Sequence, residues 1–366
     1  MNTTRTSILA AATAAAAAAM LVGAAGTAPA AVQPTGSRAV VGHVYEATNA
    51  SGSNAVAVFD RYRDGSLHPA GSVATGGVGA GASLHSQGGL ARDGRILFVV
   101  NAGDDSVSAL ASTEHGLVLR DRISSGGDFP VSVTVRDGVG YVLNQGNDTI
   151  NGFRYDASGH LRRLPDSTRH LTPNPAGGTT DAAQVSFTPD GRSLVVTEKA
   201  ANRIETFGVV GGSAGHARPH ASAGTTPYGF DFDKRGRAIV SEAATGSVSS
   251  YRVRPFGVIT SALPDTQLAA CWVAVAGDLA YVVNAASPSI SSYRIAPDGS
   301  LTLEAAVAAT TGAGPTDAAV SPDRRTLSVR LGDGSVSSFT IGGHGQLTPA
   351  GTAAGTAYGP AGLTAD

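Results

Sequence analysis

The chain has 366 residues, of which 15% are charged, with a formal net charge of −2, 48 glycines and one cysteine. A charge so close to neutral argues against nucleic acid or an anionic membrane surface as a partner. The single cysteine excludes an internal disulfide and a zinc site made of several cysteines. Abundant glycine with few charges suits a fold of many short strands and tight turns.

The first 30 residues have the features of a secretory signal. Arg5 precedes an apolar, alanine-rich stretch over 7–25, and small residues follow at 28–30. This order predicts a signal peptide over 1–30 and a linker over 31–39, with a membrane anchor as the alternative. We therefore expect a secreted, extracellular protein that has no membrane contact after cleavage, with residues 40–366 forming one domain.

A strand pattern then recurs seven times along the chain. Each copy has a polar turn, a branched apolar residue, two small or polar residues and a large apolar residue. The copies are 54–59, 105–110, 148–153, 202–207, 246–251, 288–293 and 334–339, and their last residues lie 42 to 54 positions apart. A repeat of this length made only of strands is typical of a β-propeller blade.

Each repeat predicts four strands. A small-residue strand comes first, and an Asp-Gly hairpin turn such as Asp93-Gly94 or Asp190-Gly191 leads to a hydrophobic strand such as 96–100. The recurring strand and a looser outer strand complete the blade. We therefore predict an all-β fold, a seven-bladed β-propeller with four-stranded blades.

The two ends of the domain are out of register with the repeat. The segment from Val40 to Tyr45 matches a second strand, and the missing innermost strand appears at the other end as Tyr358–Leu363. We expect this last strand to close the ring by pairing inside the first blade, which removes free sheet edges. Deleting 358–366 is then predicted to collapse stability.

The ends of the second strands form a set of equivalent positions. The seven residues are polar or charged: Glu46, Asn101, Asn144, Glu198, Glu242, Asn284 and Arg330. Strand ends face one mouth of a propeller's channel, so these groups are predicted to converge on a substrate-binding pocket. The alternative is structural: Asn commonly caps strand ends by bonding its own turn, and Arg330 would then only neutralise the glutamates.

Inner strands and their preceding loops supply further candidates. His85 precedes an inner strand and suits a general base at neutral pH, or else lies in a surface loop. Gln184 and Trp272 lie on inner strands, where Trp272 forms a stacking wall or packs between blades, and Lys199 follows Glu198. Cys271 is predicted to be a buried thiol. His216 and His220 are predicted to lie in a glycine-rich loop over 211–224, with a weak metal site as the alternative.

Several phrases resemble the seven-bladed β-propeller lactonase family, which includes 6-phosphogluconolactonase-like proteins and carboxymuconate-lactonising cyclases. The phrases are 97–101 with 105–108, 185–192, 197–199 with 202–204, and 281–284. The resemblance implies a lactonase or cyclase active at the channel mouth and places the family's catalytic glutamate at Glu242. The family's His-rich segment corresponds to 179–184 in this chain, which has no His, and the arginine usual after the ring Asn is replaced by Ala285.

Two functions follow as hypotheses. In the first, a lactone or an unsaturated acid binds at the channel mouth. Glu242, Glu198 or His85 acts as the acid or base. Arg330 holds a substrate carboxylate, and the other substrate-binding residues are Glu46, the three Asn residues, Gln184 and Trp272. In the second, a non-catalytic extracellular propeller binds a small molecule, glycan or protein. No cofactor is expected, although the Glu and Asn oxygens would suit calcium. A monomer is the expected state.

Overall fold

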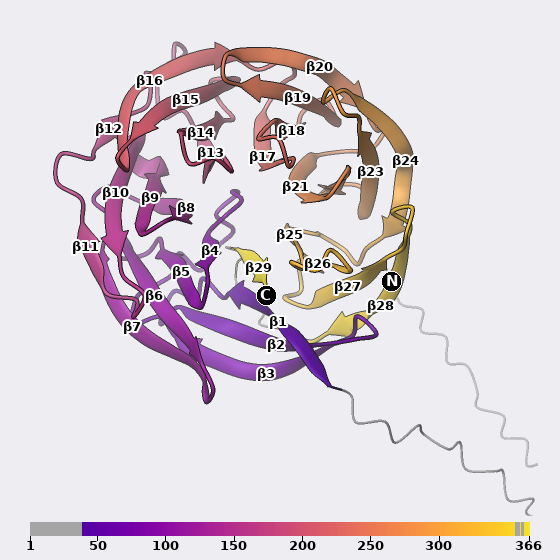
Figure 1. Cartoon of the computed structure of the whole chain (residues 1–366), viewed down its shortest axis with the longest axis horizontal. Helices are drawn as coiled ribbons and strands as arrows, with labels where there is room; N and C mark the ends of the chain where they lie inside the picture. The colour runs from indigo at the N-terminus through magenta and orange to yellow at the C-terminus, as the bar shows by residue number, and fades with distance from the viewer. Residues whose placement is uncertain (1–38, 356–358, 360–361) are drawn as a thin grey trace, which may run out of the picture. The chain divides into compact units, whose positions relative to one another are not determined.

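The computed structural model describes residues 39–355, 359 and 362–366, and these form seven antiparallel sheets arranged as blades around a ring (Figure 1). The predicted fold class is confirmed. The predicted signal peptide and nearly all of the linker lie outside the described residues. No helix in the described part of the chain has the length and apolar character needed to cross a membrane.

The blades are numbered by their place along the chain, and the strands of each blade are named from the centre of the ring outward. Blade 1 contains β29 (Leu363–Ala365), β1 (Val40–Ala47), β2 (Ala55–Tyr62) and β3 (Leu67–Ala74). Blade 2 contains β4 (Leu90–Asp93), β5 (Ile96–Asn101), β6 (Ser106–Thr113) and β7 (Gly116–Ser124). Blade 3 contains β8 (Pro130–Arg136), β9 (Val139–Asn144), β10 (Thr149–Tyr155) and an outer edge split into β11 (Leu161–Arg163) and β12 (Arg169–His170), and the short 3-10 helix η1 (Gln145–Asn147) joins β9 to β10.

The remaining blades follow the same order. Blade 4 contains β13 (Ala182–Phe187), β14 (Ser193–Glu198), β15 (Arg203–Val210) and β16 (Ser213–Ala221). Blade 5 contains β17 (Pro227–Phe232), β18 (Ala238–Glu242), β19 (Ser247–Val253) and β20 (Phe256–Pro264). Blade 6 contains β21 (Ala270–Ala276), β22 (Leu279–Asn284), β23 (Ser289–Ile295) and β24 (Leu301–Thr310). Blade 7 contains β25 (Asp317–Val320), β26 (Thr326–Arg330), β27 (Val336–Ile341) and β28 (Leu347–Ala353).

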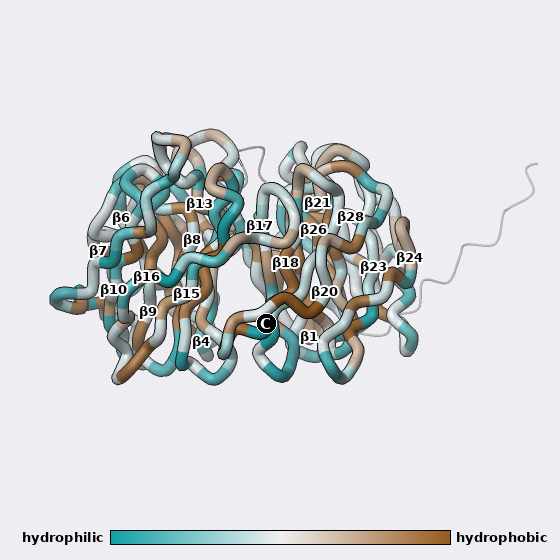
Figure 2. The backbone as a smooth tube through the Cα atoms, turned by 90° about the horizontal axis from the view of Figure 1, so that it is seen from above, coloured by the Kyte–Doolittle hydropathy of each residue, from teal (hydrophilic) through white to brown (hydrophobic). Residues whose placement is uncertain are grey.

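In blades 2 to 7 the second strand is the most completely buried one. All six residues of β5, β9, β14 and β22 are buried. Such a strand has neighbouring blades packed on both of its faces, so its sequence is continuously hydrophobic rather than alternating. Figure 2 shows hydrophobic stretches concentrated in the strands, while many of the connecting turns are polar.

The recurring pattern forms the third strand of every blade, as predicted. In β6, for example, the branched residue Val107 and the large residue Leu110 are both buried between blades. In β6 the residues between them are Ser108 and Ala109, whose small side chains leave room for the neighbouring sheet.

Ring closure occurs in blade 1, as predicted. Strand β29 pairs antiparallel with β1, matching Val44 with Ala365 and Glu46 with Leu363 (Figure 1). The Tyr45 hydroxyl donates to the Asp366 carboxylate at 2.8 Å. The closing strand begins at Leu363 and therefore later than predicted, and Tyr358, Pro360 and Ala361 lie outside the described residues.

The segment over 211–224 was wrongly predicted as a loop. Residues Ser213–Ala221 form β16, the outer strand of blade 4. His220 stacks on Phe256 with ring centroids 3.8 Å apart and bonds the Thr206 hydroxyl at 3.0 Å. Strand pairing with β15 overrides the local effect of the glycines at both ends of the segment.

Candidate functional site

The seven positions predicted to be equivalent do lie at or next to the ends of the second strands. They are Glu46, Asn101, Asn144, Glu198, Glu242, Asn284 and Arg330, and each is 0% exposed. We call this end of the channel the sealed end. Since none of these side chains reaches solvent, the contacts of each decide what it does.

The three asparagines cap the turns into the third strands. Asn101 Nδ2 donates to the hydroxyls of Ser106 at 3.0 Å and Ser108 at 2.8 Å. The same residue spacing recurs for Asn284, which bonds Ser289 and Ser291, and for Asn144, which bonds Thr149 and Asn151. These bonds fix the strand-to-strand turn and match the structural alternative for the asparagines.

Glu242 is enclosed by its own blade and by the chain that leads into it from blade 4. Its carboxylate accepts hydrogen bonds from Ser222 Oγ at 2.8 Å and from the Tyr251 hydroxyl at 3.0 Å. A Cβ placed on Gly224 would lie 2.6 Å from the Glu242 side chain, so the chain at Gly224 covers it closely. Burial raises the pKa of Glu242, and the hydrogen bonds from Ser222 and Tyr251 oppose that rise.

Arg330 forms a fully buried ion pair with Glu46 across the seam between blades 7 and 1. The Nε–Oε1 distance is 2.5 Å, and Arg330 Nη1 also donates to the Leu331 carbonyl at 2.9 Å. Glu242 and Arg330 have no hydrogen-bond or ion-pair partner in common among the described residues, and neither lines the cavity in the central channel. The structure therefore does not bring these two together, and their predicted roles stay predictions.

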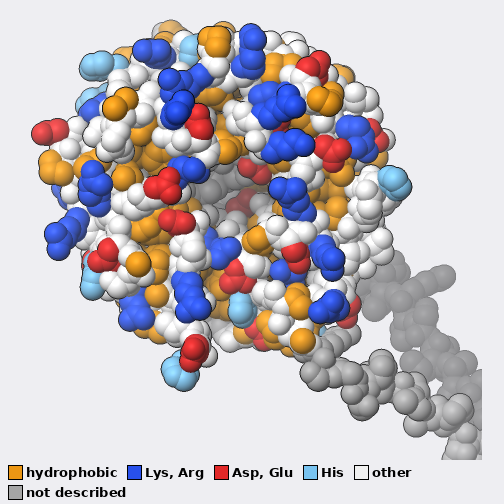
Figure 3. Space-filling view, viewed as in Figure 1, with side chains coloured by type: hydrophobic (Ala, Val, Ile, Leu, Met, Phe, Trp, Pro, Cys, Tyr) orange, Lys and Arg blue, Asp and Glu red, His pale blue; other side chains and the backbone are white. Residues whose placement is uncertain are grey.

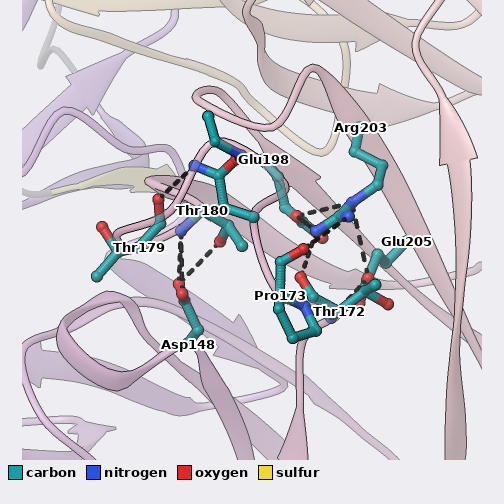
Figure 4. Close-up of polar contacts among 10 residues, drawn as sticks. Asp148, Thr172, Pro173, Thr179, Thr180, Glu198, Arg203 and Glu205 are labelled. Atoms are coloured by element: carbon teal, nitrogen blue, oxygen red, sulfur yellow. Dashed lines mark hydrogen bonds and ion pairs between the residues drawn. The ribbon is translucent and has the colours of Figure 1, made fainter.

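Glu198 belongs to a buried carboxyl pair (Figure 4). Arg203 Nε donates to Glu198 Oε2 at 3.1 Å, and Glu205 Oε1 accepts the backbone N–H of Thr172 at 2.8 Å. Within the described residues, Glu198 Oε1 and Glu205 Oε2 have no hydrogen-bond partner. Burial and the neighbouring Glu205 raise the pKa of Glu198 to about 8, against the hydrogen bond and charge of Arg203, so Glu198 is mostly protonated at neutral pH.

A segment of the loop before β4, residues 84–88, crosses the sealed end. The indole of Trp272 donates to the Ser86 carbonyl at 2.9 Å, and Lys199 Nζ donates to the His85 carbonyl at 2.6 Å. Gln87 forms two hydrogen bonds with the backbone of Val273, so the chain before β4 bridges to blade 6 (Figure 1).

The structure thus brings three sequence candidates together: His85, Lys199 and Trp272. Trp272 is 4% exposed and meets Tyr228 edge-on at 5.3 Å, so it packs, whereas the His85 side chain is exposed. Lys199 is buried 3.2 Å from Asp181, and burial lowers the pKa of its ammonium group. These groups hold the seal in place rather than lining an open pocket.

Beyond the seal, the central channel contains a cavity of about 500 Å³. Gln87 and Gly88 border it at the sealed end, and Arg92 and Arg324 border it near the turns that follow the inner strands, which we call the open end. Figure 3 shows a hollow at the centre of the ring. The cavity volume falls within the range of small-molecule sites.

Polar side chains in the channel form hydrogen bonds between neighbouring inner strands. Gln184 accepts the backbone N–H of Phe230 at 2.7 Å, Asp231 accepts that of Val275 at 2.8 Å, and Asp317 accepts that of Leu363 at 2.9 Å. Each bond satisfies a backbone donor on the channel-facing edge of the next blade. Gln184 therefore lines the cavity, but its amide group bonds protein backbone, and its predicted role in substrate binding stays a prediction.

Two of these channel residues are aspartates whose pKa values are raised toward neutral pH. Burial raises the pKa of Asp231 to about 6, against hydrogen bonds from the backbone of Val275 and Phe232. Burial also raises the pKa of Asp317 to about 7. A carboxyl group with such a pKa can accept or donate a proton near pH 7.

Sequence reasoning missed both aspartates. The available signal was an acid within otherwise apolar strands, at 227–232 and 317–320. Buried acids of this kind are rare unless they are paired or have a function. In the described part of the chain, no group of three or more His, Cys, Asp or Glu side chains is placed to hold a metal ion.

The model of the family "Lactonase, 7-bladed beta-propeller" matches this chain over residues 43–168 and 136–267. The chain belongs to this family. Its sequence is similar to the 6-phosphogluconolactonase of Sodalis glossinidius, with 31% identity over 105 residues, which cover 28% of this chain and 31% of the relative. The corresponding Klebsiella pneumoniae protein is 25% identical over 167 residues, covering 42% and 48%.

These alignments span 31% and 48% of the curated relatives' own length. The solved structures reach further along the chain. The periplasmic gluconolactonase of Pseudomonas aeruginosa superposes with a TM-score of 0.65 at 18% identity, covering 88% of this chain and 98% of that one. The superposition shows a common fold, and at 18% identity it shows nothing beyond the fold.

Proposed function

We propose that this protein is a secreted lactone hydrolase that binds a small anionic lactone in the central channel from the open end. The observation that carries the proposal is the channel cavity of about 500 Å³ with Asp231 and Asp317 in its wall. Membership of the lactonase family and the names of the relatives support the reaction class.

The chemistry follows from the carboxyl groups. Asp231 takes a proton from a water molecule, whose oxygen adds to the lactone carbonyl carbon. The bond from that carbon to the ring oxygen then breaks, and the ring oxygen receives the proton that Asp231 took, which gives a hydroxy acid and restores the Asp231 carboxylate. Each Asp231 oxygen accepts one backbone N–H and keeps a lone pair for water.

Substrate charge is set by the open end. Arg92 and Arg324 border the cavity there, and guanidinium groups favour carboxylate or phosphate substituents. Relatives named 6-phosphogluconolactonase support a sugar-acid lactone as the substrate class. Ring closure of an unsaturated acid, as in a cyclase, would be a different reaction in the same channel: the carboxylate oxygen of the substrate adds to its C=C bond, and a protonated carboxyl group of the channel supplies the proton to the neighbouring carbon.

The test is hydrolysis of sugar, aliphatic and carboxymuconate-type lactones by the protein from residue 31 onward, with Asp231→Asn and Glu242→Gln as a matched pair. We expect kcat/KM to fall at least about 100-fold in Asp231→Asn and to stay near wild type in Glu242→Gln. In the wild type, kcat/KM should rise as pH increases through about 6, because the base must be ionised. Loss of turnover in Glu242→Gln alone, with an unchanged melting temperature, would contradict the channel site.

The second candidate function is non-catalytic binding in the same channel. It is favoured by the contacts of Glu242, the position of the family's catalytic glutamate, which is fully buried and hydrogen-bonded within its blade. Saturable binding of a lactone or hydroxy acid without turnover, lost in Asp231→Asn, would select this function over hydrolysis.

A further inference from the structure

A second cavity, of about 580 Å³, lies outside the channel at blade 5 and shares no residue with the channel lining. Its wall is made by turns of three blades: 188–190 from blade 4, 234–237 and 252–254 from blade 5, and 297–298 from blade 6. Turns from adjacent blades thus form one hollow on the surface.

Charge sets this cavity apart. Five cationic side chains line it, from Lys234, Arg235, Arg237, Arg252 and Arg254. The lining contains only two acids, Asp190 and Asp298, although the chain as a whole has a net charge of −2. A concave site with an excess of one charge concentrates ligands of the opposite charge.

Both acids are engaged within their own turns. Asp190 accepts from Thr188 Oγ1 at 2.6 Å, and Asp298 accepts from the Ser300 backbone at 2.9 Å and from its hydroxyl at 2.7 Å. These bonds shape the turns, and no ion pair joins either acid to a cation of the lining among the residues that the structure describes.

Three of the arginines are held in place by backbone carbonyls. Arg235 and Arg237 both donate to the Pro297 carbonyl, at 2.7 and 2.9 Å, and Arg254 donates to the Arg192 carbonyl at 2.9 Å. Arg237 is also ion-paired with the buried carboxylate of Asp233, so its charge is largely neutralised. Arg235 and Arg254 keep further N–H groups, because a guanidinium has five donors. Fixing the side chains beforehand lowers the entropy cost of binding a ligand.

The other two cations are available. Among the residues that the structure describes, the Lys234 ammonium and the Arg252 guanidinium have no hydrogen-bond or ion-pair partner, and both side chains are exposed. Pro189, Val253 and Pro297 add apolar surface between the charges. A ligand would therefore meet unsatisfied donors at two points and an apolar wall between them.

We propose that this cavity binds a sugar-sized molecule that carries a phosphate or sulfate group. The arginine forks match the tetrahedral oxyanion, the apolar residues suit the face of a sugar ring, and the volume accommodates one or two rings. The proposal does not depend on lactone hydrolysis, because the two cavities share no residue.

The test is isothermal titration calorimetry at low ionic strength with two probes, glucose 6-phosphate and a sulfated heparin-derived disaccharide. The variant Lys234→Gln/Arg252→Gln is compared with Arg162→Gln/Arg163→Gln, which removes the same charge from the exposed strand β11. We expect binding of at least one probe, weakened about tenfold or more in the first variant and within about twofold of wild type in the second.

The relative affinities of the probes distinguish a phosphorylated metabolite from a sulfated glycan. If both double variants bound the probes with equally weakened affinity, the attraction would come from the overall charge of the protein, and the proposed site would be overturned. Absence of binding of either probe at millimolar concentration would also overturn it. Matching melting temperatures of the two variants serve as the control for folding.

Discussion

The two ends of the channel use polar side chains for opposite purposes. At the sealed end, the polar residues at the ends of the second strands bond turns, hydroxyls and one another, and residues 84–88 cross above them. At the open end, Arg92 and Arg324 border a cavity with ionisable carboxyls in its wall. The equivalent positions at the ends of the second strands therefore stabilise the turns. The side chains that could react with a ligand lie instead along the inner strands, where the channel contains a cavity.

Removing the closing strand is expected to have the largest effect, since β29 completes blade 1 and lies beside the channel. Deletion of residues 362–366 removes the pairing with Val44 and Glu46 and leaves the Tyr45 hydroxyl without Asp366. The melting temperature should fall by more than about 10 °C or the protein should become insoluble. Differential scanning calorimetry checks this, with Thr364→Ala as the control that keeps the backbone pairing.

Arg330→Ala tests whether the sealed end is structural. The substitution leaves Glu46 buried without its ion-pair partner, which should cost about 3–5 kcal/mol of unfolding free energy. Urea unfolding followed by Trp272 fluorescence measures it. The double variant Glu46→Gln/Arg330→Met should recover most of the loss, and a cost below about 1 kcal/mol for Arg330→Ala would show that the pair carries little.

Gln87→Ala tests the seal itself. It removes both hydrogen bonds to Val273, so we expect a loss of about 1–2 kcal/mol and faster amide exchange at Val273. Hydrogen exchange resolved by mass spectrometry or NMR localises the effect. An exposed polar control, Gln346→Ala in the outer turn of blade 7, should leave exchange at Val273 unchanged.

The smallest expected effect concerns pH and Glu198. Its pKa in the folded protein is raised to about 8, above its unfolded value, so the fold binds this proton more tightly. Stability should therefore fall as pH rises from about 5 through 8. In Glu198→Gln, the drop in melting temperature over this pH range should be smaller than in the wild type by about 2 °C. Exposed Glu114→Gln is the control, and an identical pH dependence of the melting temperature in Glu198→Gln and wild type would contradict the raised pKa of Glu198.

Much of the architecture was accessible from the sequence because blades repeat. The pattern that ends in Leu110 or Phe153 marked the third strands correctly, and the ends of the second strands at Asn101 and Glu198 were placed in register. The repeat encodes these positions through periodic burial, which a single chain displays seven times.

The site was less accessible because it depends on which way side chains point across blade seams. Glu242 and Arg330 occupy equivalent positions, yet Glu242 bonds Tyr251 of its own blade and Ser222 just before that blade, whereas Arg330 bonds Glu46 of the next blade. Asp231 acquires its environment from Val275, a residue 44 positions away in another blade. No local pattern records such a contact.

Closure of the ring within blade 1 has a kinetic consequence. The pairing of Val44 with Ala365 joins residues more than 300 positions apart, whereas the hairpins inside each blade join neighbours. Contacts across such separations cost the most chain entropy and are made late on a folding pathway. The pairing between β1 and β29 is thus expected to form last during folding and to break first during unfolding. An otherwise folded ring with this pairing open is the expected last intermediate.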